Sequence, residues 1–249
     1  MSMYTPHIYS PHPIEMNATL HLDEKKSHHL KHVLRIKQGC EVTLFCGDGK
    51  TYQGTIMATD AKLVAIHIDA CLPLQQESPC KIRLIQGLCR FDKMDWVVQK
   101  TTELGIHDIY PCLMDHSDIK IKGDRAAKKH QHWQAVATQA CEQAKRQKLP
   151  VIHPVLTCSD ILSLLPASTH LCVLNPHQQG SSWPGDEADD ITLIIGPEGG
   201  FSSAELDLLQ RHKARSLHLG PRILRTETAA ITAISLAQFK YGDLNTNPT

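Results

Sequence analysis

Hydrophobic and polar residues alternate in short stretches over the first 72 residues, which is the period of half-buried β-strands. The stretch 40–46 alternates up to a Gly-Asp-Gly turn, and 51–56 resumes the extended pattern after it. A β-branched run at 63–68 predicts a further strand, whereas 27–35 has the apolar spacing of a short helix. Several short strands with little helix predict a small β-barrel.

From residue 81 onward, candidate strands alternate with candidate helices. Ser202-Ser203-Ala204-Glu205 has the form of a capping box, so a helix is expected to begin there. Alternation of this kind is typical of an α/β fold, a mostly parallel sheet with helices on both faces. The expected strands are 81–87, 106–111, 171–174, 191–195 and 215–219, and the expected helices are 92–104, 125–144, 202–212 and 226–241.

The two patterns meet at a proline-containing segment. Residues 73–80 include Pro73 and Pro79 and suit a linker between domains. We therefore expect an N-terminal β-barrel over residues 1–72 and an α/β domain over residues 81–249.

The composition argues against several classes of protein. No apolar run approaches the roughly 18 residues that a membrane helix needs, and the first residues lack the basic and apolar regions of a secretory signal. Nine cysteines, an odd number without any Cys-x-x-Cys pair, argue against a disulfide framework and against a closed zinc site. We therefore expect a cytoplasmic protein with no membrane segment and no metal.

Charge is balanced overall but unevenly distributed. With 26 basic and 26 acidic side chains the formal net charge is zero, so the total charge does not indicate a nucleic-acid partner. Between Lys120 and Lys148, however, eight Lys or Arg residues face only Asp124 and Glu142 as acidic residues. Such a basic run is either a solvated helix face or a surface for an acidic partner.

A glycine-rich loop at 196–200 follows the expected strand 191–195, at the edge where parallel sheets bind ligands. Its glycines permit close backbone approach and positive φ, and the next helix offers unpaired N–H groups. The loop lacks the spacing and the lysine of phosphate-binding loops, and Glu198 would repel a phosphate. It suits a cationic ligand such as a sulfonium, and the alternative is a tight turn without a ligand.

A second distinctive loop follows the last expected strand. Ile223 and Leu224 are apolar in a turn that should be exposed, which suits the wall of a slot for an adenine ring. Arg225, beside the N–H groups that open the last helix, is placed to hold an RNA phosphate or a polarised base. Thr226 or Thr228 can cap that helix, which is a structural role.

Together the two loops resemble the paired cofactor loops of the SPOUT superfamily of methyltransferases. More narrowly, the chain is similar to the RsmE family, which methylates N3 of a uridine in bacterial 16S ribosomal RNA. The chain departs from this family at residues 89–92, Cys-Arg-Phe-Asp, where a Lys-Gly or similar small pair is usual, and at Lys145, where a small residue is usual. The further family marks are His28 with Val33-Leu34-Arg35, Lys93-Met94-Asp95-Trp96, residues 99–105, Ala140-Cys141-Glu142-Gln143 with Arg146, and Asn175-Pro176-His177.

The resemblance implies a PUA-like β-barrel that binds RNA, followed by a SPOUT methyltransferase domain whose C-terminal part forms a deep trefoil knot. It implies S-adenosylmethionine as the cofactor and 16S ribosomal RNA, within the 30S subunit, as the substrate. It also implies a homodimer whose cofactor sites lie near the subunit interface. An apolar stripe of Ile231, Ile234, Ala237 and Tyr241 in the last helix suits either such an interface or the domain's own core.

With the resemblance, roles are assigned to individual residues. Arg225 would orient the uracil or stabilise its developing anion, and Glu198 is a candidate acceptor of the N3 proton. The candidates for RNA binding are Arg35, Lys37, Lys100, Arg125, Gln143 and Arg146. The candidates for cofactor binding are Leu174, Asn175, Ile195, Gly196, Pro197, Glu198, Gly200, Leu219, Gly220, Ile223, Leu224, Glu227 and Thr228.

Three other functions fit parts of the sequence. A SPOUT enzyme with another RNA target, such as a ribose 2′-hydroxyl, would carry the same loops. A non-catalytic RNA-binding protein could retain the knot as a scaffold, although the intact pair of loops argues against it. A nucleotide-hydrolysing enzyme is disfavoured, because the sequence has neither a phosphate-loop lysine nor a metal-ligand cluster.

Overall fold

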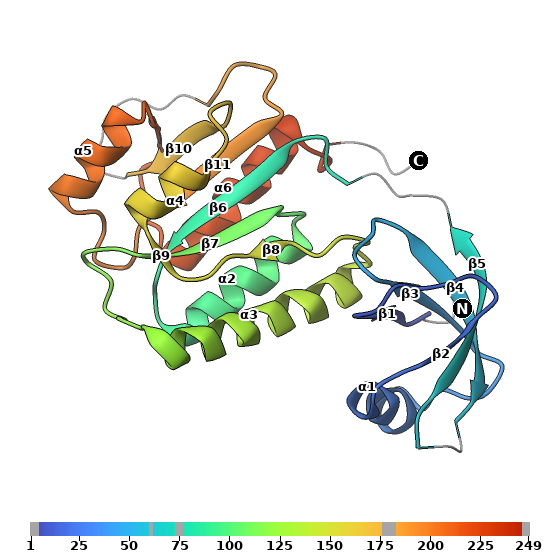
Figure 1. The fold of residues 1–249 in the computed structure, drawn as a ribbon. Helices are drawn as coiled ribbons and strands as arrows, with labels where there is room; N and C mark the ends of the chain where they lie inside the picture. The colour runs from blue at the N-terminus through green and yellow to red at the C-terminus, as the bar shows by residue number, and fades with distance from the viewer. Residues whose placement is uncertain (1–4, 60–61, 73–76, 176–182, 246–249) are drawn as a thin grey trace. The chain divides into compact units, whose positions relative to one another are not determined.

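The chain divides into two compact units in the computed structural model (Figure 1). Unit 1 comprises residues 1–76 and 141–149, and unit 2 comprises residues 77–140 and 150–249. The sequence pattern does not anticipate that a short segment from the middle of the α/β region groups with the first unit. The residues that the structure describes are 5–59, 62–72, 77–175 and 183–245.

Unit 1 is built on a five-stranded sheet that curls into a half-barrel, with strand order β1-β3-β4-β5-β2. β1 runs parallel to β3, and the other neighbouring strands are antiparallel. Fully buried side chains such as Val42, Leu44 and Ile66 form its core. The strands are β1 (His7–Tyr9), β2 (Thr19–His21), β3 (Glu41–Phe45), β4 (Thr51–Ala58) and β5 (Ala65–Leu72).

The strands expected near residues 40, 51 and 63 are present as β3, β4 and β5, whereas β1 and β2 span three residues each, too few for a period to show. The expected short helix begins earlier, as α1 (Glu24–His28). It begins there because the side chain of Asp23 accepts a hydrogen bond from the backbone N–H of Lys26 at 2.8 Å. It continues as a π-helical turn, His29–Val33.

Segment 141–149 is held in unit 1 by bonds to β1. The Nε2 atom of His7 lies 3.0 Å from the carbonyl oxygen of Arg146, and the backbone N–H of Tyr9 donates to the carboxylate of Glu142 at 3.0 Å. Burial lowers the pKa of His7, whose ring stacks on Phe45 at 4.5 Å. The imidazole therefore acts here as a neutral packing group that also makes a hydrogen bond.

Unit 2 contains a seven-stranded sheet in which every observed pairing is parallel. The strand order is β12-β10-β11-β6-β7-β8, and β9 also pairs with β7. The central strands are continuous apolar runs because both of their faces are covered. The strands are β6 (Lys81–Gly87), β7 (Asp108–Leu113), β8 (Val151–Ile152), β9 (Leu156–Thr157), β10 (His170–Leu174), β11 (Asp190–Ile195) and β12 (Arg215–Leu217).

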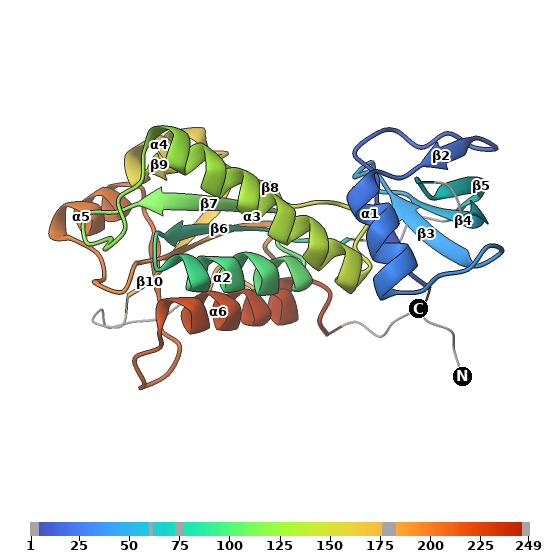
Figure 2. The ribbon, with the colours of Figure 1, turned by 90° about the horizontal axis from the view of Figure 1, so that it is seen from below.

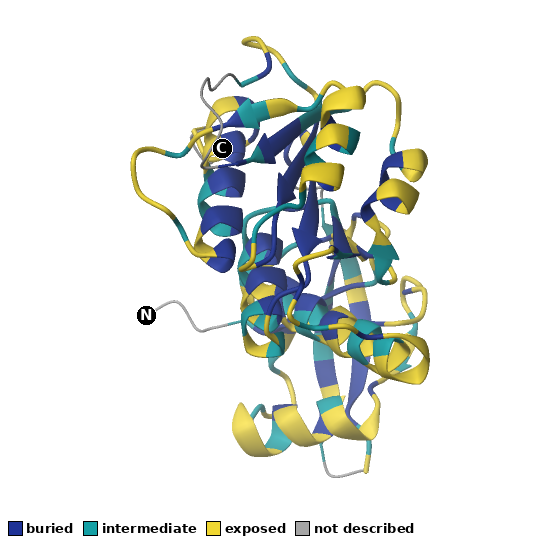
Figure 3. Ribbon diagram, turned by 90° about the vertical axis from the view of Figure 1, so that its left-hand side faces the viewer, coloured by how far each residue is buried: buried dark blue, intermediate teal, exposed yellow. Residues whose placement is uncertain are grey.

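Helices cover both faces of this sheet, as the alternating pattern predicts. One core cluster joins the strands to α2 (Phe91–Glu103), α3 (Gly123–Ala144) and α6 (Thr226–Tyr241). A second cluster, on the opposite face, joins them to α4 (Cys158–Leu164) and α5 (Ser203–Arg211). Figure 2 shows α2 and α6 side by side along the sheet, and Figure 3 shows the buried strands lying between helices with exposed outer sides.

Most expected elements of unit 2 are present within two or three residues of their expected ends, and β6 coincides with the expected strand. The capping box forms, since Ser202 and Glu205 bond reciprocally at the start of α5. Gly105 adopts the left-handed φ of +83° that ends α2. The helix α4 is not anticipated. None of the helices in the described ranges is both long enough and apolar enough to cross a bilayer.

Two predictions concern residues that the structure does not describe. Residues 73–76 of the expected linker and residues 176–182, which include Pro176 and His177 of a family mark, lie outside them. The trefoil knot stays a prediction.

Candidate active site

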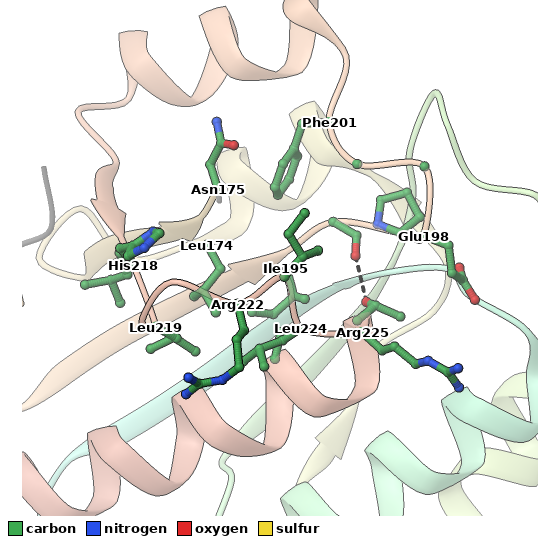
Figure 4. A pocket seen from close by; sticks show the side chains of 18 of the residues that line it. Leu174, Asn175, Ile195, Glu198, Phe201, His218, Leu219, Arg222, Leu224 and Arg225 are labelled. Atoms are coloured by element: carbon green, nitrogen blue, oxygen red, sulfur yellow. Dashed lines mark hydrogen bonds between the residues drawn. The ribbon is translucent and has the colours of Figure 1, made fainter. Parts of the chain in front are cut away.

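A pocket of about 660 Å³ lies where β10, β11 and β12 end. The register of the sheet places Leu174, Ile195 and Leu217 side by side at these carboxyl ends. Figure 4 shows the side chains of Leu174, Ile195, Leu219 and Leu224 gathered around the pocket. The volume and the apolar walls are typical of a site for a small organic ligand.

The first loop, after β11, follows the turn geometry that its glycines permit. Gly200 has φ +73° and its N–H donates to the carbonyl of Pro197 at 3.0 Å, which closes the turn. A Cβ atom on Gly196 would lie 3.1 Å from the ring of Phe201, another pocket residue. A Cβ on Gly87, at the end of β6, would lie 2.5 Å from the nitrogen of Pro197. The loop therefore rests directly on the neighbouring strand end.

The second loop, after β12, closes the other side of the pocket. Gly220 has φ +86°, Ile223 is 79% exposed, and Leu224 is half-buried against the core. The expected caps are wrong: the cap position of α6 is Arg225, which makes no side-chain cap bond, and Thr228 is exposed. The hydroxyl of Thr226 instead donates to the carbonyl oxygen of Gly196 in the first loop at 2.7 Å.

Three charged side chains meet beside the pocket. The ammonium of Lys93, from α2, lies 3.3 Å from a carboxylate oxygen of Glu198 and 3.5 Å from one of Glu227. Although desolvation lowers the pKa of Lys93, its bond with Glu198 and the charges of both carboxylates raise that pKa above its ordinary value overall. Burial, together with the same two carboxylates, raises the pKa of the Cys89 thiol to about 12.

This cluster corrects the reasoning from Glu198 to a cationic ligand. Its carboxylate is not free, because Lys93 and the backbone N–H of Arg90, at 3.5 Å, already contact it. Two carboxylates, Glu198 and Glu227, face one ammonium, so one formal negative charge remains to attract a cation. The group that attracts a cation is therefore the cluster and not a single side chain.

All the residues expected to bind the cofactor line the pocket except Glu227 and Thr228. Glu227 is buried behind Lys93, and Thr228 points to solvent. Arg225 lines the pocket as expected. The pocket is also lined by residues outside the predicted set, among them Lys93, Phe201, His218 and Arg222. Of these, Phe201 and Arg222 adjoin the loops, and Lys93 lies in a family mark.

Comparisons with known proteins agree on one family. Residues 76–238 match the family described as RNA methyltransferase domain, and residues 22–69 match the RNA methyltransferase PUA domain. The ribosomal RNA small subunit methyltransferase E of Buchnera aphidicola subsp. Schizaphis graminum is 30% identical over 247 residues, which cover 98% of this chain and 100% of that protein. The chain belongs to the ribosomal RNA small subunit methyltransferase E (RsmE) family.

Further proteins are similar to this chain along almost their whole length. The protein of that name from Bacillus subtilis is 29% identical, with 91% of this chain and 92% of that protein covered. The structure of the Neisseria gonorrhoeae member bound to S-adenosyl methionine has a TM-score of 0.90 at 29% identity and covers 97% of this chain and 100% of that one. A putative methyltransferase from Legionella pneumophila in complex with the cofactor SAM has a TM-score of 0.91 at 36% identity, with the same coverage.

The pocket fits the cofactor of the RsmE family. Apolar side chains from three strand ends and the second loop offer walls for an adenine ring, and the glycine-rich turn leaves backbone groups within reach. The cluster of Lys93, Glu198 and Glu227 carries one surplus negative charge for the positively charged end of the molecule. S-adenosylmethionine supplies, when bound, a methyl group made electrophilic by its sulfonium.

The six RNA-binding candidates fall in both units. In unit 1, Arg35, Lys37 and Gln143 are exposed, and Arg146 is half-buried. In unit 2, the ammonium of Lys100 is already bonded to both carboxylate oxygens of Glu103 at 2.9 Å, which weakens its case as a phosphate ligand. Arg125 is exposed at the start of α3 and lies over the ring of Phe91.

Proposed function

We propose that this chain transfers the methyl group of S-adenosylmethionine to N3 of a uridine in 16S ribosomal RNA. Membership of the RsmE family supports this proposal, and one structural observation carries it. The two loops expected to hold the cofactor meet in one pocket at the carboxyl ends of parallel strands, with a cationic side chain, Arg225, in its wall.

The acceptor atom sets the chemical task. N3 of uridine carries a proton and is a weak nucleophile at neutral pH, so the enzyme must remove or share that proton. N3 also lies on the Watson–Crick edge, so the target base must be unpaired or drawn out of its stack. Holding N3 against the methyl carbon contributes further, ~7 kcal/mol or more in favourable cases.

Arg225 is the residue proposed to meet the uracil. It is exposed and pairs with no carboxylate among the described residues, so its guanidinium is available to a ligand. A guanidinium beside the base would orient it and stabilise the negative charge that develops as N3 loses its proton. Glu198 is proposed as the proton acceptor, because it is the one carboxylate among the described residues that line the pocket.

The test uses small ribosomal subunits that lack the modification, together with labelled S-adenosylmethionine. We expect the wild type to transfer label to a uridine, with the methyl group located on N3 by mass spectrometry of the nucleosides. Arg225→Ala should keep the cofactor dissociation constant and lose most of kcat, and Arg225→Lys should recover part of it. A methyl group on a ribose 2′-oxygen, or full turnover by Arg225→Ala, would contradict this assignment.

The proposal includes a homodimer, supported by apolar side chains that remain exposed in unit 2. Trp96 on α2 is 52% exposed, Phe239 on α6 is 60% exposed, and Ile223 of the second loop is 79% exposed. The stripe considered from the sequence is not this surface, since most of it is buried in the core of the unit. Sedimentation of Phe239→Glu should give a monomer where the wild type gives a dimer. The enzyme would then meet the 30S subunit as a dimer in the cytoplasm.

A further inference from the structure

The first turns of α3 carry cations that no described carboxylate neutralises. Arg125, Lys128 and Lys129 lie there, Arg125 and Lys128 are exposed, and none of the three is within ion-pair distance of a described Asp or Glu. Arg125 also lies in the first turn of the helix, where the helix dipole disfavours a positive charge. The stability of the helix therefore does not explain this arrangement.

Two of these cations share one aromatic ring. The ammonium of Lys129 lies 4.2 Å from the ring centroid of Phe91, and the guanidinium carbon of Arg125 lies 5.3 Å from it. Arg125 and Lys129 are four residues apart, so they occupy the same helix face and repel each other. The ring attracts both through its quadrupole and holds the pair together.

Phe91 is itself fixed in place and stands next to the pocket. Its ring packs against the core of unit 2, which holds the ring in position. The preceding backbone N–H, of Arg90, points to the carboxylate of Glu198 at 3.5 Å, and Lys93, two residues after Phe91, lines the pocket. The cation pair is thus attached to the same end of α2 that borders the pocket.

We propose that Phe91, Arg125 and Lys129 form a phosphate-binding site for the RNA strand that enters the pocket. The inference rests on the proposed function, which does not specify where the RNA backbone is held. Two adjacent unpaired cations, one of them a guanidinium with a planar fork of donors, match the charge and geometry of a backbone phosphate.

The experiment measures binding of unmodified 16S ribosomal RNA over a series of salt concentrations. Removing this phosphate contact should reduce the magnitude of the slope of log K against log salt by about 0.7, since each phosphate contacted on a single strand contributes ~0.7. We expect this loss in the double variant Arg125→Ala/Lys129→Ala, with a raised KM for RNA and with kcat and cofactor affinity unchanged. Phe91→Leu, which keeps the apolar contact and removes the aromatic face, should lose part of the same slope.

The matched control removes one Arg and one Lys at the end of α5, on the other face of the sheet. In Arg211→Ala/Lys213→Asn the asparagine suits the left-handed φ of +58° at residue 213, and the salt slope should stay that of the wild type. Equal slopes in the two double variants would overturn the site. The site would also be overturned if Phe91→Leu unfolded at the same temperature as the wild type and bound RNA with the same salt slope. Wild-type binding with the expected slope but without methyl transfer would instead leave the site intact and overturn the proposed function.

Discussion

The hydroxyl of Thr226 donates a 2.7 Å hydrogen bond to the carbonyl oxygen of Gly196, and this bond ties the second loop to the first (Figure 4). The same hydroxyl accepts a 2.8 Å bond from the side-chain amide of Gln86, which is fully buried at the end of β6. Strand β6, the glycine-rich loop and the start of α6 therefore meet at one oxygen atom. The distance between the two walls of the pocket depends on it.

Thr226→Val should damage the pocket without a change of side-chain shape. The substitution leaves the Gly196 carbonyl and part of the Gln86 amide unsatisfied in a buried place, at a cost of about 1–3 kcal/mol in the free energy of unfolding. We expect the dissociation constant for S-adenosylmethionine to rise about tenfold, equivalent to about 1.4 kcal/mol. Calorimetric titration measures it, and Thr226→Ser, which keeps the hydroxyl, is the control. Equal affinity in the valine and serine variants would contradict this role.

The sequence pattern predicts well the strands, helices and loops that form this site. A fully buried strand such as β6 is a continuous apolar run with clear ends, and a capping box such as that of Ser202 and Glu205 has a local signal. Local order and the rule that ligands bind beyond the strand ends were enough to place both loops around one pocket. These features are encoded within a few residues of where they act.

Contacts between residues that are distant in the sequence cannot be predicted from the same local patterns. Lys93 is 105 positions from Glu198, and nothing around it indicates that its ammonium reaches two carboxylates. Thr226 looked like a helix cap because its partner, Gly196, is 30 residues away. Residues 141–144 end an apparently regular helix, yet Glu142 and Arg146 also bond to the first strand of unit 1. Tertiary packing decides such cases and leaves no periodic signal.

Gly87→Ala should shift the first loop. The new methyl group would lie 2.5 Å from the nitrogen of Pro197 and 2.9 Å from the carbonyl carbon of Gly196, both backbone atoms that cannot rotate away. We expect a loss of about 1–3 kcal/mol from overpacking, seen as a lower urea midpoint, together with weaker binding of the cofactor. Gly185→Ala is the matched control, since among the described residues no atom other than those of its chain neighbours lies within 4 Å of its Cβ position. Two variants with the same midpoint would show that the strand and the loop do not make this close contact.

Lys93→Met should destabilise the protein through Glu227. That carboxylate is 6% exposed, and its Oε2 atom has no hydrogen-bond partner among the described residues, so the nearby ammonium of Lys93 is its main compensation. We expect a lower urea midpoint for Lys93→Met and recovery of part of it in Lys93→Met/Glu227→Gln, where no unpaired charge is buried. If the second substitution lowers the midpoint further, the two side chains do not compensate each other.

Cys172 should make the protein less stable in alkali. Burial raises the pKa of its thiol from 9.0 to about 12, so the folded state keeps a proton that the unfolded state loses. Stability from this group is therefore complete below pH 9.0 and falls as the pH rises toward 12, by up to about 1.4 kcal/mol per pH unit. Urea unfolding in the presence of a reductant should give a shallower decline in this range for Cys172→Ala than for the wild type. Cys71 is exposed, so Cys71→Ala should retain the wild-type decline; a Cys172→Ala curve parallel to these two would show that the thiol does not titrate with folding.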